Sequence, residues 1–121
     1  MESLCELSSA VMVAESDEDM EIGASVVAGI DRYGNLVVGM DFIDYEDHGR
    51  DYEQHAIVER ELAEAMARRL GTRMERLPRL LADRCGDDSR ILVPSQVEAV
   101  FQQTLEFMLD YGARYRLRRD R

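Results

Sequence analysis

The chain of 121 residues contains no tryptophan and no lysine, and it has only two cysteines, two prolines and two histidines. Cys5 and Cys85 lie far apart and form no CxxC pair. Neither a disulfide framework nor a thiolate metal site is therefore indicated, and both cysteines are expected to be free thiols. All the basic residues other than histidine are arginine, which is typical of a GC-rich bacterial genome. The alternative explanation is that arginine is preferred for its bidentate ion pairs.

Long hydrophobic runs are also absent, since no apolar stretch approaches the ~20 residues that a membrane-spanning helix needs. Residues 1–6 carry acids where a signal peptide has a basic flank followed by an apolar stretch. These features predict a cytoplasmic protein without membrane insertion. Because 45% of the residues are hydrophobic, we expect residues 1–121 to form a single domain with its own core.

Negative charge is concentrated in the first half of the chain. Residues 1–55 hold 14 acids and two arginines, whereas residues 56–121 hold 11 acids and 13 arginines, so net charges of −12 and +2 make up the total of −10. Direct nucleic-acid binding needs clustered cations to neutralise phosphates and is therefore disfavoured. A basic protein partner is favoured instead.

The first half predicts strands, because short runs of β-branched and aliphatic residues alternate with polar segments. Asp31–Asn35 has the composition of a hairpin loop in which Gly34 takes a positive φ. An acidic loop is expected from Glu15 to Asp19 and a polar loop over Asp44–Asp51. The predicted strands are Ser9–Ala14, Ala24–Ile30, Asn35–Phe42 and Tyr52–Val58.

The second half predicts helices. Apolar residues recur every four positions from Val58 to Leu70, which indicates a helix over Glu59–Leu70 that ends at Gly71. The segment after Thr72 resembles a capping box, but Pro78 conflicts with a continuous helix. We therefore expect a helical turn, a break at Leu77-Pro78 and a short helix to about Cys85 that ends at Gly86.

The last helix is predicted over residues 95–111, with Ser95 to Glu98 as its capping box. Its apolar stripe comprises Val97, Val100, Phe101, Thr104, Leu105, Met108 and Leu109.

A final strand is predicted beyond Gly112, because Ala113, Tyr115 and Leu117 alternate there with three arginines at positions 114, 116 and 118. Its arginines should face solvent at a protected sheet edge. The expected fold is α+β, with an antiparallel sheet of about four to five strands and three helices packed on one face.

No motif for catalysis or for a cofactor stands out. A calcium loop beginning at Asp44 would place Gly49 correctly, but His48 and His55 would then occupy positions that need oxygen ligands. These are also the only histidines, too few for an ordinary zinc site without cysteine at ligand spacing. A cysteine–histidine pair could form in space, yet no flanking motif supports one. We therefore predict no metal, no cofactor and no enzyme activity.

Residues 41–53 combine six acids with three aromatic residues, which is the chemistry of a recognition surface for a basic partner. A solvated loop that only keeps the protein soluble is the alternative. The predicted partner-binding residues are Asp41, Phe42, Asp44, Tyr45, Glu46, Asp47, Asp51, Tyr52 and Glu53. Charge reversal at Asp44, Asp47 and Asp51 is expected to weaken partner binding without unfolding the domain.

Four local features occur together in this chain. They are a hairpin with the sequence GNLVV, a Gly-Met-Asp turn, an acidic DYE before a strand and helix, and a final helix running through LDYGARYRLR. In this layout, residues 24–118 resemble small bacterial proteins encoded beside polymorphic-toxin genes, which are regarded as immunity proteins. The resemblance implies a non-catalytic inhibitor that blocks a cognate toxin, and it carries over no individual site residue.

Two other functions fit a small acidic protein of this class. A secretion chaperone would be dimeric and bind an extended segment of an effector. A nucleic-acid mimic would need carboxylates spaced like phosphates in order to occupy a DNA-binding groove. The sequence leaves the oligomeric state open between monomer and homodimer.

Overall fold

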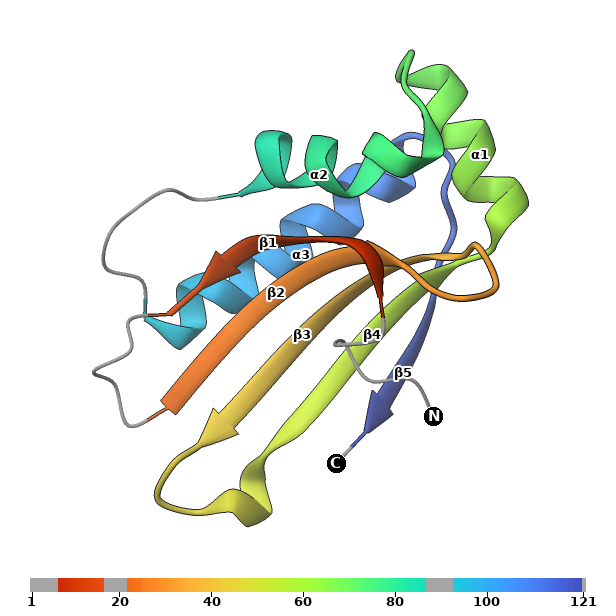
Figure 1. Ribbon diagram of the computed structural model, residues 1–121. Helices are drawn as coiled ribbons and strands as arrows, with labels where there is room; N and C mark the ends of the chain where they lie inside the picture. The colour runs from red at the N-terminus through yellow and green to blue at the C-terminus, as the bar shows by residue number, and fades with distance from the viewer. Residues whose placement is uncertain (1–6, 17–21, 87–92, 121) are drawn as a thin grey trace.

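The computed structural model describes residues 7–16, 22–86 and 93–120, and it has an α+β fold. Figure 1 shows five strands side by side in chain order, with every neighbouring pair antiparallel. Most of the predicted acidic loop after Glu15 lies outside the described residues, as does Cys5. The strands are β1 (Ser8–Glu15), β2 (Ile22–Ile30), β3 (Leu36–Asp44), β4 (Tyr52–Val58) and β5 (Arg116–Asp120).

The hairpin between β2 and β3 is held by the side chain of its first residue. Asp31 Oδ1 accepts the backbone N–H groups of Tyr33 and Asn35, both at 2.9 Å, and Gly34 has a φ of +84°. The side-chain oxygen of Asn35 also accepts the N–H of Arg60 at 3.1 Å. The first N–H groups of a helix have no partner within the helix. The hairpin therefore caps the helix that begins at Arg60 and ties it to the sheet.

Three α-helices follow in the described residues: α1 (Arg60–Arg69), α2 (Leu77–Cys85) and α3 (Pro94–Asp110). Short 3₁₀ turns, η2 (His48–Arg50) and η3 (Met74–Arg76), precede β4 and α2. Pro78 stands in the first turn of α2, where its missing N–H costs no helical hydrogen bond. The predicted helical turn and the short helix to Cys85 are confirmed, but the break expected at Leu77-Pro78 is not found there, since η3 ends at Arg76 and α2 begins directly at Leu77.

The helices α1 and α3 both end in a glycine with left-handed backbone. Gly71 has a φ of +68° and Gly112 of +77°. After each glycine, the next N–H reaches back to a carbonyl in the last turn, from Thr72 to Ala67 and from Ala113 to Met108. Both ends are thus Schellman motifs, as the glycines predict.

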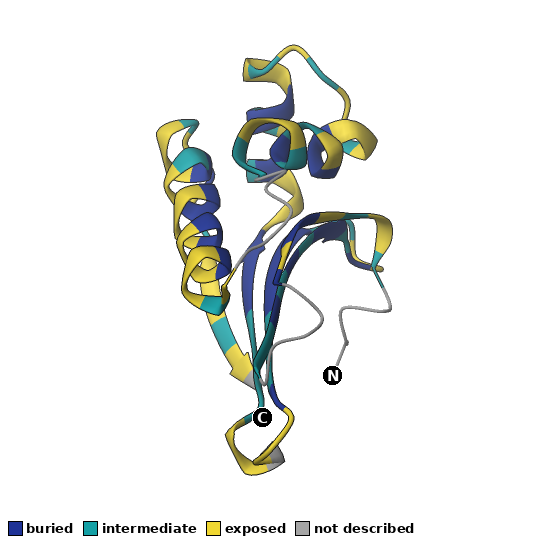
Figure 2. Cartoon of the chain, turned by 90° about the vertical axis from the view of Figure 1, so that its left-hand side faces the viewer, coloured by how far each residue is buried: buried dark blue, intermediate teal, exposed yellow. Residues whose placement is uncertain are grey.

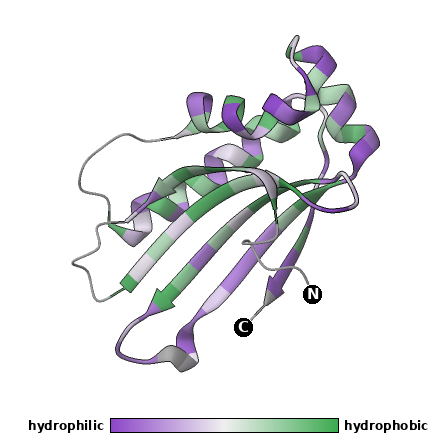
Figure 3. Cartoon of the chain, viewed as in Figure 1, coloured by the Kyte–Doolittle hydropathy of each residue, from purple (hydrophilic) through white to green (hydrophobic). Residues whose placement is uncertain are grey.

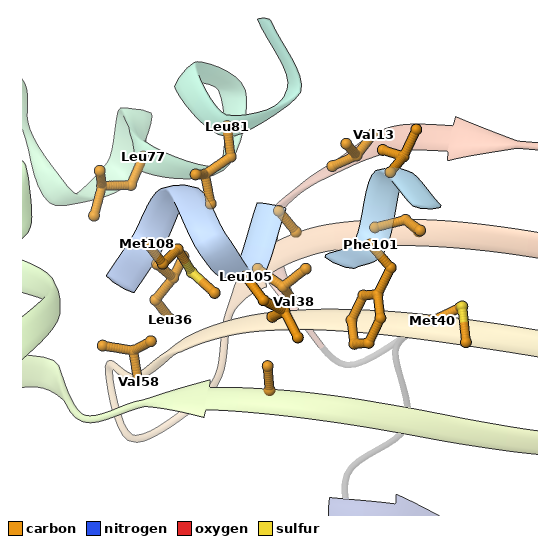
Figure 4. Close-up of a cluster of buried hydrophobic side chains, with 14 of the residues drawn as sticks. Val13, Leu36, Val38, Met40, Val58, Leu77, Leu81, Phe101, Leu105 and Met108 are labelled. Carbon is orange, nitrogen blue, oxygen red and sulfur yellow. The ribbon is translucent and has the colours of Figure 1, made fainter. Parts of the chain in front are cut away.

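The helices cover one face of the sheet, called here the helix face (Figure 2). Figure 4 shows the ring of Phe101 of α3 beside Met40 of β3, with Leu105 and Met108 further along α3 beside Val38 and Leu36. A bulge in β1 near Val13 lets both that residue and the next point into the core. Fully buried large side chains include Leu36, Val38, Val58, Met66, Leu77, Leu81, Val97, Phe101 and Met108.

The structure corrects three local predictions. The cap of α3 is not Ser95: the helix begins at Pro94, and the N–H of Val93 donates to Oε1 of Gln96 at 2.9 Å. Leu109 of the predicted stripe is 46% exposed, because it lies at the margin of the arc that faces the core. Gly39–Asp41, expected as a turn, lie within β3.

The last strand also differs from its prediction. Regular pairing begins at Arg116, and Leu117 is 51% exposed, whereas Arg118 is partly buried and reaches His55 on β4. The reason is position in the sheet: α3 makes its main sheet contacts with β1, β2 and β3, so the helix face of edge strand β5 is left uncovered. Arg114 and Arg116 are exposed as predicted, whereas the predicted orientation of Leu117 and Arg118 is wrong.

Candidate functional site

Strand geometry divides the predicted acidic and aromatic segment between two faces of the sheet. Successive side chains of a strand point to opposite sides. Phe42 and Tyr52 therefore point to the helix face, where their rings stack with centroids 5.0 Å apart. Asp41 and Glu53, paired across β3 and β4, point to the other side. These four residues do not form one contact surface.

The loop between β3 and β4 is organised by two of its own carboxylates. Asp44 is buried, and its Oδ1 accepts the N–H groups of Glu46 and Asp47 at 3.0 and 3.1 Å. Oδ1 of Asp51 accepts the N–H of Asp44 at 2.7 Å. Such bonds fix a tight loop. Charge reversal at Asp44, Asp47 and Asp51 would therefore alter the loop itself, and it does not isolate an effect on partner binding. Glu46 and Asp47 are exposed at its tip.

The face opposite the helices, called here the open face, carries no helix of the described residues (Figure 2). Its end near the β2–β3 hairpin is covered by Leu7, which packs over Gly29. The other end carries a row of side chains that are paired across neighbouring strands. We call it the acidic row: Glu15, Ser25, Asp41 and Glu53, from β1 to β4.

The carboxylates of the acidic row repel one another. Burial raises the pKa of Asp41 above its ordinary value, and the negative charges of Glu53 and Asp51 raise it further. Like charges directly opposite each other on neighbouring strands are destabilising. A cation placed over Asp41 and Glu53 would relieve this repulsion.

A shallow hollow of about 180 Å³ opens beside the acidic row. Glu15, Ser25 and Asp41 supply polar groups to its wall, and Ile43 and Tyr45 supply apolar surface. Tyr45 is 56% exposed, and its ring lies against Gly23, where a Cβ atom would fall 3.0 Å from the hydroxyl oxygen. The hollow is smaller than the ~300–1,000 Å³ of typical small-molecule sites. It fits a single side chain better than a cofactor.

The sequence alone did not predict that Glu15 belongs to this site. It stands 26 positions before Asp41, at the start of what appears as a separate acidic loop. Strand pairing through Ser25 brings the two carboxylates to one surface. The alternation within each strand shows which residues share a face, but the register between β1 and β2 depends on the bulge at Val13.

The described residues offer little for metal or thiol chemistry. Within residues 7–16, 22–86 and 93–120, no three His, Cys, Asp or Glu side chains group so that they could hold a metal ion. Cys85 is a free, partly buried thiol. Burial raises its pKa, against smaller opposing effects of a hydrogen bond with Thr104 and the charge of Arg84. A raised pKa leaves less of the nucleophilic thiolate at neutral pH.

Figure 3 shows hydrophilic residues in the β3–β4 loop, in the first half of β4 and along much of β5. None of the helices in the described part of the chain is both long and apolar enough to cross a lipid bilayer.

Comparison of the chain with protein-family models, with curated proteins and with solved structures finds no match.

Proposed function

We propose that this chain is a non-catalytic binding protein that neutralises a basic protein partner, in the manner of an immunity protein that blocks a bacterial toxin. The acidic row beside the hollow on the open face is the observation that carries the proposal. Its carboxylates attract and orient a cationic surface, and its hollow accepts one projecting side chain of that surface. Anchor residues seated in small pockets supply most of the binding energy in many protein interfaces.

The composition of the hollow favours an arginine or lysine of the partner as the anchor. Asp41 and Glu15 provide carboxylates for charge-assisted hydrogen bonds, which are stronger than bonds between neutral groups. The exposed ring of Tyr45 offers a face on which a cation can rest. A neutral or acidic side chain would leave the repulsion between Asp41 and Glu53 uncompensated.

The first experiment measures binding of a hexa-arginine peptide by isothermal titration calorimetry. The key variant is Glu15→Gln with Asp41→Asn, and the matched control is Glu98→Gln with Glu106→Gln, since both acids of the control lie exposed on α3. Both double variants remove two charges. We expect the first to weaken binding at least about tenfold and the second to change it little, with affinity falling from about 0.05 M to about 0.5 M salt. Equal losses in both variants would mean that net charge alone is responsible.

The second experiment tests the inhibitor function with a biological partner. The product of the neighbouring reading frame is expressed with and without this chain, and the two proteins are purified together. A stable complex in which that product loses its activity is the expected result. A dimer of this chain that binds an extended segment and leaves the activity intact would instead identify a secretion chaperone.

A further inference from the structure

His55 is buried in β4 on the open face, next to the acidic row, with only 3% of its surface exposed. Its ring contacts two charged side chains. Nε2 lies 3.1 Å from Oε2 of Glu53, and Nδ1 lies 3.0 Å from Nη2 of Arg118. Arg118 is also the residue of β5 that pairs with His55 across the two strands. One imidazole ring thus joins the acidic row to the edge of the sheet.

The chemistry of the two neighbours fixes the proton on this ring. An arginine guanidinium can only donate hydrogen bonds, so Nδ1 must accept the bond from Arg118. An ionised carboxylate can only accept, so Nε2 must carry the hydrogen that is donated to Glu53. A neutral ring with its hydrogen on Nε2 satisfies both contacts. A second proton on Nδ1 would point at the Arg118 guanidinium and remove the acceptor that it uses.

The charged groups around His55 divide into two sets. Asp41 on β3 and Glu53 on β4 favour a positive ring, whereas Arg118 and the exposed Arg116 on β5 oppose it. A ring with a second proton on Nδ1 would keep its hydrogen bond to Glu53 through Nε2. The contact that must then break is the one with β5.

From this geometry we propose that His55 is a proton-sensitive clasp for the edge strand β5. The neutral ring accepts a hydrogen bond from Arg118 and so strengthens the pairing of β5 to β4; protonation at Nδ1 removes this acceptor and loosens β5. The other contacts between the two strands are their backbone pairing and the guanidinium of Arg119 over the ring of Tyr52, and β5 is short and pairs only with β4 in the described part of the chain. Histidine is the side chain that ordinarily changes its charge between about pH 5 and pH 8.

The test uses NMR of the whole chain without any partner, so that it stands apart from the proposed binding function. In His48→Gln, His55 is the one remaining histidine, and its ¹⁵N shifts report the tautomer at about pH 8. Amide exchange then gives protection factors for residues 116–119 at about pH 8 and about pH 5, corrected for the intrinsic pH dependence of exchange. Amides of β2 and β3 serve as the internal control.

We expect the Nε2–H tautomer at high pH, and a loss of protection in β5 of about tenfold or more on acidification, while β2 and β3 change little. The pH effect should be absent in His55→Gln. Should that variant fail to fold, Arg118→Leu provides the second test, because the hydrogen bond to His55 is absent there and β5 should no longer respond to pH. An Nδ1–H tautomer, unchanged β5 protection in the parent, or the same acid response in both variants would each overturn the proposal.

Discussion

Gly71 and Gly112 end α1 and α3 in the same way, yet substitution should affect them differently. Both have a positive φ, so alanine at either position carries the cost of left-handed backbone, about 1–2 kcal/mol. A Cβ on Gly71 would meet nothing within 4 Å. A Cβ on Gly112 would collide with Nη1 of Arg69, which donates a hydrogen bond to the carbonyl of Tyr111 at the end of α3.

The side chain of Arg69 is flexible, so it can move aside at the cost of that hydrogen bond. Because the bond is exposed to solvent, we assign it the net contribution of an ordinary hydrogen bond, about 0.5–1.5 kcal/mol, and not the larger contribution of a bond to a charged group. Gly71→Ala should therefore lower the free energy of unfolding by about 1–2 kcal/mol, and Gly112→Ala by about 2–3 kcal/mol. The difference of about 1 kcal/mol measures how strongly Arg69 of α1 holds the end of α3.

Urea unfolding followed by circular dichroism measures both values, and a third variant isolates the cause. In an Arg69→Met background the two glycine substitutions should cost the same, because the hydrogen bond is already gone. Equal costs in the presence of Arg69 would refute the role of its contact. A difference that persists in the Arg69→Met background would show that some other feature of Gly112 is responsible.

Three further predictions concern the loop, the core and the open face. Asp44→Ala removes an acceptor of two backbone N–H groups and should lower the free energy of unfolding by about 1–2 kcal/mol in thermal denaturation, with faster amide exchange in the β3–β4 loop. Phe101→Ala should cost about 3–5 kcal/mol, whereas exposed Leu109→Ala should stay within about 0.5 kcal/mol; similar losses would contradict the assigned core. Asp41→Asn should stabilise the protein at neutral pH, because the raised pKa of Asp41 means that its charge costs stability as the pH rises through and above the ordinary value of 3.8. Unfolding at several pH values checks this, and a gain that persists well below pH 3.8 would count against the explanation.

The sequence predicts most of the elements of this fold, because their signals are local. A run that ends in Ala56, Ile57 and Val58 after a polar loop marks β4, whose observed bounds of Tyr52–Val58 match the prediction. Glycine marks the ends of α1 and α3, and Asp31 with Gly34 marks the hairpin. Each of these features depends on residues a few positions apart, so no knowledge of the tertiary structure is needed.

The candidate site depends on relations that no local pattern contains. Alternation shows that Leu117 and Arg118 point in opposite directions, but which side is buried depends on where α3 crosses the sheet. The buried partner of Arg118 is His55, 63 positions earlier in the chain. Likewise, clustering in the sequence placed Asp44 with Asp41, whereas the fold uses the first to build a loop and leaves the second on the open face.

The two faces of the sheet affect stability in opposite ways, and this contrast supports a binding role for the acidic row over a role in solubility alone. On the helix face, burial of apolar side chains stabilises the fold. On the open face, Asp41 is partly buried opposite Glu53, a poor position for a charge whose only task is to keep the protein soluble. Exposed acids such as Glu46 could serve that task without the cost of burial. Interface charges are often retained although they lower stability. The same substitution, Asp41→Asn, should therefore raise stability and weaken the binding of a cationic partner, whereas a charge kept for solubility would affect neither binding nor its salt dependence.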